Sequence, residues 1–179
     1  MLAMFTPLEH AASMAMITRL RPLLHRNLHS YSKEQVDVHQ LSYSALAFVG
    51  DSVWDLAIRE RALWPINTWQ SKPAKQRFRW HQQLSQAETQ AEIATRLVSS
   101  FGLKEEEEKV LYKGRHAAGK APRNVDRKIY ASATGFEVLV GYLHYSDPYR
   151  LEELFQYCWT EIEQISEQEL REMTKRRRR

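Results

Sequence analysis

The stretch ALAFVGDSVWDLAIR, residues 45–59, decides the fold that the sequence predicts. Apolar residues recur along it at helical spacing and on more than one side, which is typical of a helix at the centre of a domain. One acid, Asp51, lies inside this apolar setting. Because a carboxylate in such surroundings destabilises the fold unless its charge is compensated, we expect Asp51 to have a partner.

A second stretch of the same kind, YASATGFEVLVGYL at residues 130–143, also carries one acid, Glu137. A divalent cation compensates such charges, and two carboxylates from separate helices are a common way to hold one. The two stretches together therefore indicate a metal site. Because the region before Glu137 is strongly basic, they suggest a metal-dependent enzyme that acts on a polyanion.

Gly50, directly before Asp51, leaves an alternative open. Glycine in a helix is less stable than alanine, so its presence predicts that something approaches the backbone closely. The approaching group is either a ligand at an acidic site or a neighbouring helix. In the second case Asp51 pairs with an arginine or caps that helix.

The composition is that of an ordinary globular domain. The chain has 179 residues, of which 43% are hydrophobic and 27% charged, and this length suffices for one domain with a core. No run of eighteen apolar residues occurs, so we predict no membrane span. The single cysteine, Cys158, cannot form an internal disulfide or a Cys-rich zinc site, and we expect it to pack among apolar neighbours.

Helical periodicity dominates the chain after residue 40 and no stretch is typical of a strand, so we predict an all-α fold. The predicted domain covers residues 41–173, between an N-terminal extension (1–40) and a basic tail (174–179). A basic connector is expected at Ser71–Trp80. Helices are predicted at Tyr43–Leu63, Leu84–Phe101, Lys104–His116, Tyr130–Tyr145 and Leu151–Met173.

The segment from Lys109 to Tyr130 contains seven basic residues and a single acid, Asp126. A loop is expected over much of it, and its glycines and spaced cations between Lys113 and Asn124 suit contacts to phosphates without base reading. A solvated surface loop has the same composition, so this alternative stays open. The overall net charge of +4 favours a nucleic-acid partner only weakly.

Two further acids have ordinary explanations. Asp55 lies one turn after Asp51, and it either joins the acidic site or pairs with Arg59 at i+4; we favour the salt bridge. Asp126 is expected to form a turn or a helix cap with Asn124. The sequence contains no P-loop, no HExxH pair and no nucleophile elbow, so it offers no protein nucleophile.

Four blocks in this order and spacing resemble the mini-ribonuclease III family, and the resemblance extends over about residues 41–155. The blocks are ALAFVGDSVWDLAIR, KGRHA, PRNVD and ATGFEVLVGYL. The resemblance implies an all-α ribonuclease III-type endonuclease domain, a helical bundle that works as a homodimer and lacks an appended double-stranded-RNA-binding domain. It implies magnesium-dependent cleavage of double-stranded RNA, in the maturation of the ends of large-subunit (23S-type) ribosomal RNA.

The resemblance also implies roles for particular residues. Asp51 and Glu137 match the catalytic, metal-binding acids of the family. The residues expected to reach RNA are basic, and they are Lys113, Arg115, Lys120 and, by extension of the same segment, Arg123. Ala47 and Thr134 stand where full-length ribonuclease III enzymes have two more acids, as is usual in the mini family. We therefore expect water to fill more of the magnesium coordination sphere.

Two other functions remain as alternatives: a non-catalytic RNA-binding protein on the same fold, and an all-α protein-interaction module. Asp51 and Glu137 favour the enzyme over both. A ribosomal protein is a further expected partner, and no membrane is expected to be one. The first forty residues are interpreted either as a helix that packs on the domain or as an organelle-targeting leader. We accordingly expect a cytoplasmic protein or, if a leader is present, one of an organelle stroma.

Overall fold

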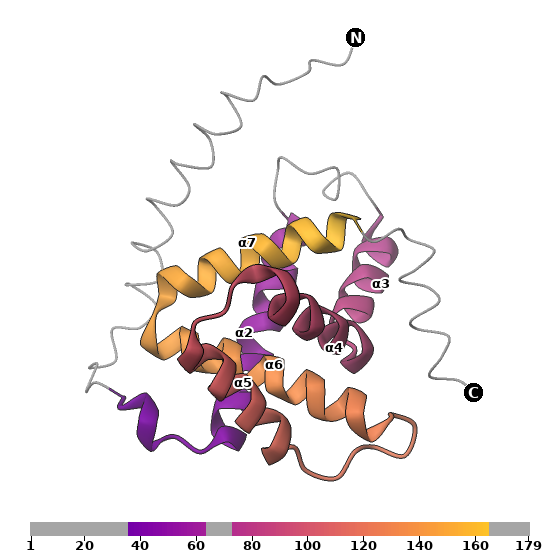
Figure 1. The fold of residues 1–179 in the computed structure, drawn as a ribbon. Helices are drawn as coiled ribbons and strands as arrows, with labels where there is room; N and C mark the ends of the chain where they lie inside the picture. Colours follow the sequence, from indigo (N-terminus) through magenta and orange to yellow (C-terminus); the bar gives the residue numbers. More distant parts are fainter. Residues whose placement is uncertain (1–35, 64–72, 165–179) are drawn as a thin grey trace. The chain divides into compact units, whose positions relative to one another are not determined.

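The computed structural model describes residues 36–63 and 73–164 of the chain (Figure 1). The chain divides into two compact units, residues 1–37 and 38–179, and all of the described helices belong to the second. The predictions for the basic tail and for nearly all of the N-terminal extension lie outside the described residues. None of the described helices is both long and apolar enough to cross a bilayer.

The described part of this unit consists of helices and contains no strand, which confirms the all-α prediction. The elements are a short 3-10 helix η1 (Val38–Gln40), α2 (Tyr43–Leu63), α3 (Ala74–Leu84), α4 (Ala87–Arg96), a π-helical turn η2 (Leu97–Phe101), α5 (Glu105–Ala117), α6 (Arg127–Ser146) and α7 (Pro148–Gln164).

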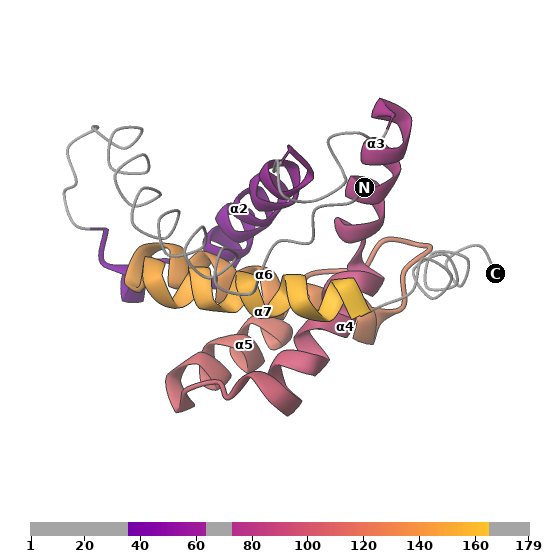
Figure 2. The ribbon, with the colours of Figure 1, turned by 90° about the horizontal axis from the view of Figure 1, so that it is seen from above.

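Helix α6 is the central element, because it packs against α2, α4, α5 and α7 (Figure 2). Its sequence explains this position: every residue from Val138 to Gly141 is buried, so the helix has no wholly polar side there. Helix α2 crosses one side of α6, and α4 and α5 cover another.

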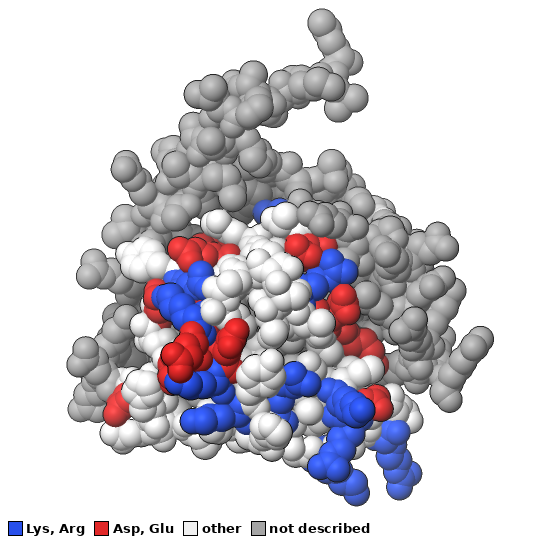
Figure 3. All heavy atoms as spheres, in the orientation of Figure 1, with Lys and Arg blue, Asp and Glu red and all other residues white. Residues whose placement is uncertain are grey.

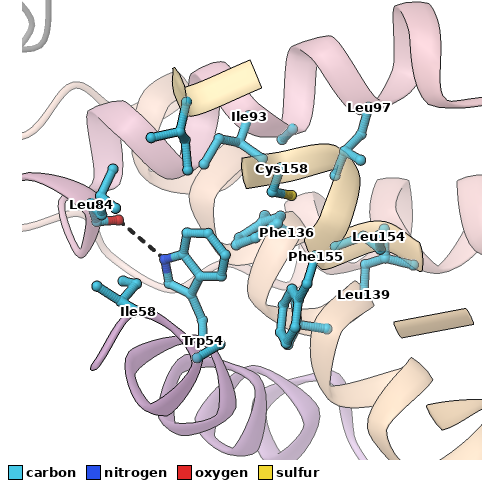
Figure 4. Packing of buried hydrophobic residues seen from close by; sticks show 14 of the residues in the cluster. Trp54, Ile58, Leu84, Ile93, Leu97, Phe136, Leu139, Leu154, Phe155 and Cys158 are labelled. Atoms are coloured by element: carbon cyan, nitrogen blue, oxygen red, sulfur yellow. Dashed lines mark hydrogen bonds between the residues drawn. The ribbon is translucent and has the colours of Figure 1, made fainter. Parts of the chain in front are cut away.

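The core between these helices is built around Trp54 of α2, which is fully buried (Figure 4). Its ring packs edge-on against Phe136 and is stacked on Trp159, with 5.1 Å between the ring centroids in each pair. Its indole Nε1 donates a hydrogen bond to the carbonyl oxygen of Leu84, at 3.1 Å. Cys158 is fully buried beside this cluster, as predicted, and burial raises the pKa of its thiol.

The prediction of a basic connector at Ser71–Trp80 is wrong for the described residues of this segment, because residues 74–84 form helix α3. Trp80 and Leu84, four residues apart, are buried and anchor the helix. The surrounding lysines and arginines concealed this apolar pair in the sequence. The predicted helix Leu84–Phe101 is likewise divided, because a turn at Ser85 separates α3 from α4.

The ends of several helices follow their sequence signals. Gly102 ends η2 with φ of +74°, a conformation that glycine adopts at little cost. Four consecutive glutamates, Glu105 to Glu108, form the first turn of α5, where the helix dipole favours negative charge. Pro148 does more than mark the end of α6: it is the first residue of α7, a position suited to proline.

Candidate active site

The site begins with the crossing of α2 and α6, where the two backbones touch. A Cβ atom on Gly50 would overlap the carbonyl oxygen of Glu137, and one on Gly141 would overlap the carbonyl oxygen of Leu46. The predicted close approach at Gly50 is therefore confirmed, and the approaching group is the backbone of α6. Of the two interpretations of Gly50, the neighbouring helix is the one observed, and this contact brings Asp51 next to the acid of that helix.

Asp51 and Glu137 share an electrostatic environment at this crossing. Asp51 is exposed on α2, whereas Glu137 is half-buried. Burial and, secondly, the charge of Asp51 raise the pKa of Glu137 to about 7. Burial and the charge of Asp55 raise the pKa of Asp51. Among the described residues no basic side chain offsets either charge, so the crossing has an excess of negative charge.

Asp55 forms the salt bridge that the sequence favours. Arg59 Nε donates to Asp55 Oδ2 at 2.8 Å, and the ring Nε2 of His81, on α3, contacts Oδ1. Burial acts to raise the pKa of Asp55, but the hydrogen bonds from Arg59 and His81 hold it below its ordinary value. Asp55 is therefore charged near neutral pH, and it also adds to the negative potential at Asp51.

Helix α4 contributes Gln90, whose side chain is 2% exposed, to the same region. The Gln90 amide partly lowers the pKa of Glu137, so its donor end faces that carboxylate. The contact falls short of a well-formed hydrogen bond, because Nε2 has no acceptor at hydrogen-bond geometry.

Comparison with known proteins identifies the family of this chain. Residues 44–148 match the ribonuclease III domain. A mini-ribonuclease 3 of Thermosynechococcus vestitus is 37% identical over 123 residues, 68% of this chain and 76% of that protein. One of Enterococcus faecalis is 35% identical over 134 residues, 73% of this chain and 98% of that protein. The chain belongs to the mini-ribonuclease III family.

A solved structure shares the fold of this chain. A Fusobacterium nucleatum protein superposes with a TM-score of 0.58 at 20% identity, and the match covers 69% of this chain and 97% of that one. The activity that follows from family membership is that of an endoribonuclease. Enzymes with a ribonuclease III domain generally depend on a divalent metal.

The acids at the crossing fit a divalent cation of the magnesium type. Within residues 36–63 and 73–164, no cluster of three or more His, Cys, Asp or Glu side chains could hold a metal. The donor set is two carboxylates from separate helices, without sulfur or imidazole, which suits a hard cation that keeps several waters and takes phosphate oxygens. It does not suit a structural zinc site. The catalytic and metal-binding roles of Asp51 and Glu137 stay predictions.

The four predicted RNA-binding residues divide between a helix and a connection. Lys113 and Arg115 are in α5, whereas Lys120 and Arg123 are exposed in the connection from α5 to α6. Within the described part of the chain none of the four pairs with an acid. Lysines and arginines gather along the lower edge of the face in Figure 3, over this connection.

Residues 113–116 belong to helix α5, in agreement with the helix predicted at Lys104–His116, and not to the loop that was expected to start at Lys113. Gly114 is buried in α5, and a Cβ atom there would lie 2.7 Å from the Cβ of Val138. Gly135 makes a matching space for the side chain of Arg115, whose guanidinium lies 5.7 Å from the ring of Tyr112. These glycines allow close helix packing, so the mini-ribonuclease III chain presents Lys113 and Arg115 from a rigid support.

Asp126 is a helix cap, as expected, although its partners differ. Its Oδ1 accepts from the backbone N–H groups of Lys128 and Ile129, at 2.8 and 3.2 Å, and so fixes the start of α6. Asn124 is not among these partners. Because of this cap, α6 begins three residues before the predicted start.

Two residues near the site, His81 and Gln90, were not predicted from the sequence. His81 follows the segment Ser71–Trp80, which was interpreted as a connector, and precedes the helix predicted from Leu84, so no element was predicted at this residue. Gln90 left a signal: it lies three residues after Ala87 and four before Ala94, so it interrupts the apolar stripe of α4. A polar side chain inside such a stripe indicates either a buried hydrogen bond or a functional contact.

Proposed function

We propose that this protein is a magnesium-dependent endonuclease that cleaves double-stranded RNA and matures the ends of large-subunit (23S-type) ribosomal RNA precursors. The observation that carries the proposal is the α2–α6 crossing, where Asp51 and Glu137 adjoin and no described basic residue compensates them. Charge of this kind is compensated by a divalent cation, which can at the same time bind an oxygen of an RNA phosphate.

Asp51 and Glu137 are the residues that would hold the cation. When bound, magnesium supplies a more acidic water near neutral pH and offsets the charge that builds on the phosphate during hydrolysis. The chain supplies the two carboxylates on rigid helices, and the Gly50 contact fixes their separation. Hydrolysis by water needs no protein nucleophile, and its products carry 5′-phosphate and 3′-hydroxyl ends.

The RNA-binding part of the proposal rests on unpaired basic residues. Lys113, Lys120 and Arg123 are exposed, and Arg115 is held by packing against Gly135. Side chains of this kind bind the phosphates of a duplex by charge and shape without reading its bases. We therefore expect binding that weakens steeply with added salt.

A homodimer is proposed on the basis of the outer face of α2. Phe48 and Leu56, eight residues apart on one side of the helix, are 77% and 49% exposed. Large apolar side chains on the surface of a central helix favour contact with a second copy of the chain. Two copies would bring two sites, one for each strand of the duplex.

The cellular setting is proposed from the substrate. Ribosomal RNA precursors occur in the bacterial cytoplasm and in the stroma of organelles, and the enzyme is proposed to act in one of the two. A ribosomal protein bound to the precursor is a further partner that would position the cleavage.

The experiment compares the purified protein with Asp51→Asn on a duplex RNA with and without magnesium, and Glu60→Gln on the same helix is the control for loss of a charge. Cleavage that needs magnesium, persists in Glu60→Gln and falls more than about 100-fold in Asp51→Asn is expected, because loss of a direct ligand exceeds the effect of losing an outer partner. Binding without cleavage by the wild-type protein would instead identify a non-catalytic RNA-binding protein.

A further inference from the structure

Gln90 has a buried side-chain amide whose N–H group has no structural role among the described residues. Its side chain is 2% exposed, and its Nε2 has no hydrogen-bond acceptor among the described residues. Buried polar groups are nearly always hydrogen-bonded, and a buried donor left unpaired costs about 1–3 kcal/mol. An apolar side chain of the same size would avoid this cost, so the amide calls for a functional explanation.

The direction of the amide indicates what it serves. Helix α4, which carries Gln90, packs on α6, and the Gln90 amide interacts with the Glu137 carboxylate. Of the two ends of an amide, only the N–H end can donate to a carboxylate. An unpaired donor thus faces an acid whose own charge has no basic partner among the described residues. Both groups are incomplete in the protein alone, and each can complete the other.

We propose that Gln90 is a positioning residue for Glu137: its Nε2 donates to one carboxylate oxygen and leaves the other oxygen free for the cation that Glu137 shares with Asp51. The proposal rests on the proposed function, because it requires a cation at the crossing. Gln90 itself contacts neither the cation nor the RNA. Partners of metal ligands that act in this way fix the orientation of the ligand and raise its affinity for the metal.

The neighbouring residue on α4 shows what a purely structural polar group looks like. Thr89 is also 2% exposed, but its Oγ1 donates to the carbonyl oxygen of Gln83 at 2.8 Å and so fastens the turn between α3 and α4. Thr89 has its partner inside the fold, whereas Gln90 does not. Thr89→Val is therefore a matched control for the loss of a buried polar group from α4.

The test measures direct binding of Mn²⁺ and Mg²⁺ by calorimetry to the full-length wild-type protein, Gln90→Met and Thr89→Val. Methionine keeps the length of the side chain and removes the donor. We expect Gln90→Met to bind the cation about 10–100-fold more weakly, as is typical when an outer partner of a metal ligand is removed. Its affinity for duplex RNA in EDTA should stay within twofold of wild type, since Gln90 does not contact RNA.

Thr89→Val is expected to lower thermal stability and leave the affinity for the cation unchanged. A Gln90→Met protein that binds the cation within twofold of wild type would overturn the proposal. Weakened binding in Thr89→Val by the same factor would overturn it as well, because loss of any buried polar group on α4 would then suffice.

A second measurement covers the case in which Gln90→Met does not fold. In the wild-type protein, the side-chain amide resonances of Gln90 are followed by NMR during titration with Mg²⁺, and Glu137→Gln serves as the comparison. We expect these resonances to shift in the wild-type protein and to stay in place in Glu137→Gln. Resonances that do not move on saturation of the wild-type site would contradict the positioning role.

The same data separate this inference from the proposed function. If the wild-type protein binds no divalent cation, or if Asp51→Asn and Glu137→Gln bind it as well as wild type, the proposed metal site fails and the positioning role fails with it. If those two variants lose the cation while Gln90→Met retains it, only the role of Gln90 fails.

Discussion

Two glutamates of this molecule, Glu107 and Glu137, are packed between helices, and they differ in the charge of their neighbours. Glu107, in the first turn of α5, is 2% exposed and is surrounded by donors. Arg150 Nε donates to its Oε1 at 2.9 Å, Arg150 Nη2 donates to Oε2 at 3.1 Å, and the backbone N–H of Lys104 donates to Oε2 at 2.8 Å. Glu137, at the α2–α6 crossing, has Asp51 as its charged neighbour instead.

The difference lies in where the compensating charge comes from. Arg150 is itself held in place, because its Nη2 donates to the carbonyl oxygen of Gly102 and its guanidinium lies 4.2 Å from the ring centroid of Phe101. The Glu107 charge is thus compensated within the fold, where it joins α5 to α7. At the crossing the fold supplies two acids and, among the described residues, no base that offsets them. A buried acid with its cation inside the fold is structural, and one without is a candidate for function.

The strongest test of this contrast removes the cation of the structural pair. Arg150→Met should destabilise the protein by about 3–5 kcal/mol, because Glu107 is left charged and buried without a partner. Equilibrium unfolding in urea measures the change. Glu153→Gln is the control, since Glu153 also pairs with Arg150 but is 63% exposed, and a change within about 0.5 kcal/mol is expected there. A loss below about 1 kcal/mol in Arg150→Met would show that the pair does not stabilise the fold.

A second test acts on the helix contact rather than on a charge. Gly50→Ala places a methyl group against the backbone of Glu137, and since backbone cannot move aside as a side chain can, we expect a loss of about 3 kcal/mol. The helices must separate, and a displacement of about 1 Å between the acids is enough to lower cleavage by about 100-fold. The measurements are urea unfolding and the initial rate of RNA cleavage.

Gly119→Ala is the matched control for Gly50→Ala, because a Cβ atom on Gly119 would meet nothing within 4 Å. Its stability should stay within about 0.5 kcal/mol of wild type. If Gly50→Ala behaved in the same way, the helix contact would not be what sets the spacing of the two acids.

The sequence was most informative where an apolar pattern and a local signal agreed. Helix α2 has the predicted bounds, Tyr43–Leu63, and its Gly50 contact follows from the cost of glycine in a helix. The Asp55–Arg59 pair and the Asp126 cap follow from spacing alone, because such contacts form within one or two turns of a helix. The all-α class follows in the same way from helical periodicity over the chain after residue 40.

Features set by contacts between distant segments could not be derived from the sequence. The burial of Trp80 in α3 depends on a core assembled from other helices, so a locally basic segment misled the prediction. The contact between His81 and Asp55 joins residues that are 26 apart, and the Glu107–Arg150 pair joins residues that are 43 apart. Gly114 was open to interpretation as flexible, and only the packing of α5 on α6 shows that it permits close approach.

The last test concerns Glu137 itself and has the opposite sign to the first. Its folded-state pKa of about 7 lies above its ordinary value of 4.5, so between these values the folded protein binds a proton that the unfolded chain releases. The stability that this proton contributes is present at pH 4 and is lost as the pH rises through 7. Glu137→Gln carries no charge, so its stability should not show this loss.

Without a divalent cation, Glu137→Gln should therefore match wild type at pH 4 and exceed it by about 1–2 kcal/mol at pH 8, a value reduced because the group keeps some contact with water. Thermal unfolding at both pH values, in EDTA, measures the difference. Saturating Mg²⁺ should stabilise wild type and leave Glu137→Gln unchanged, because only the protein that binds the ion gains from it. A variant less stable than wild type at pH 8 in EDTA would mean that Glu137, like Glu107, has its compensating charge inside the fold.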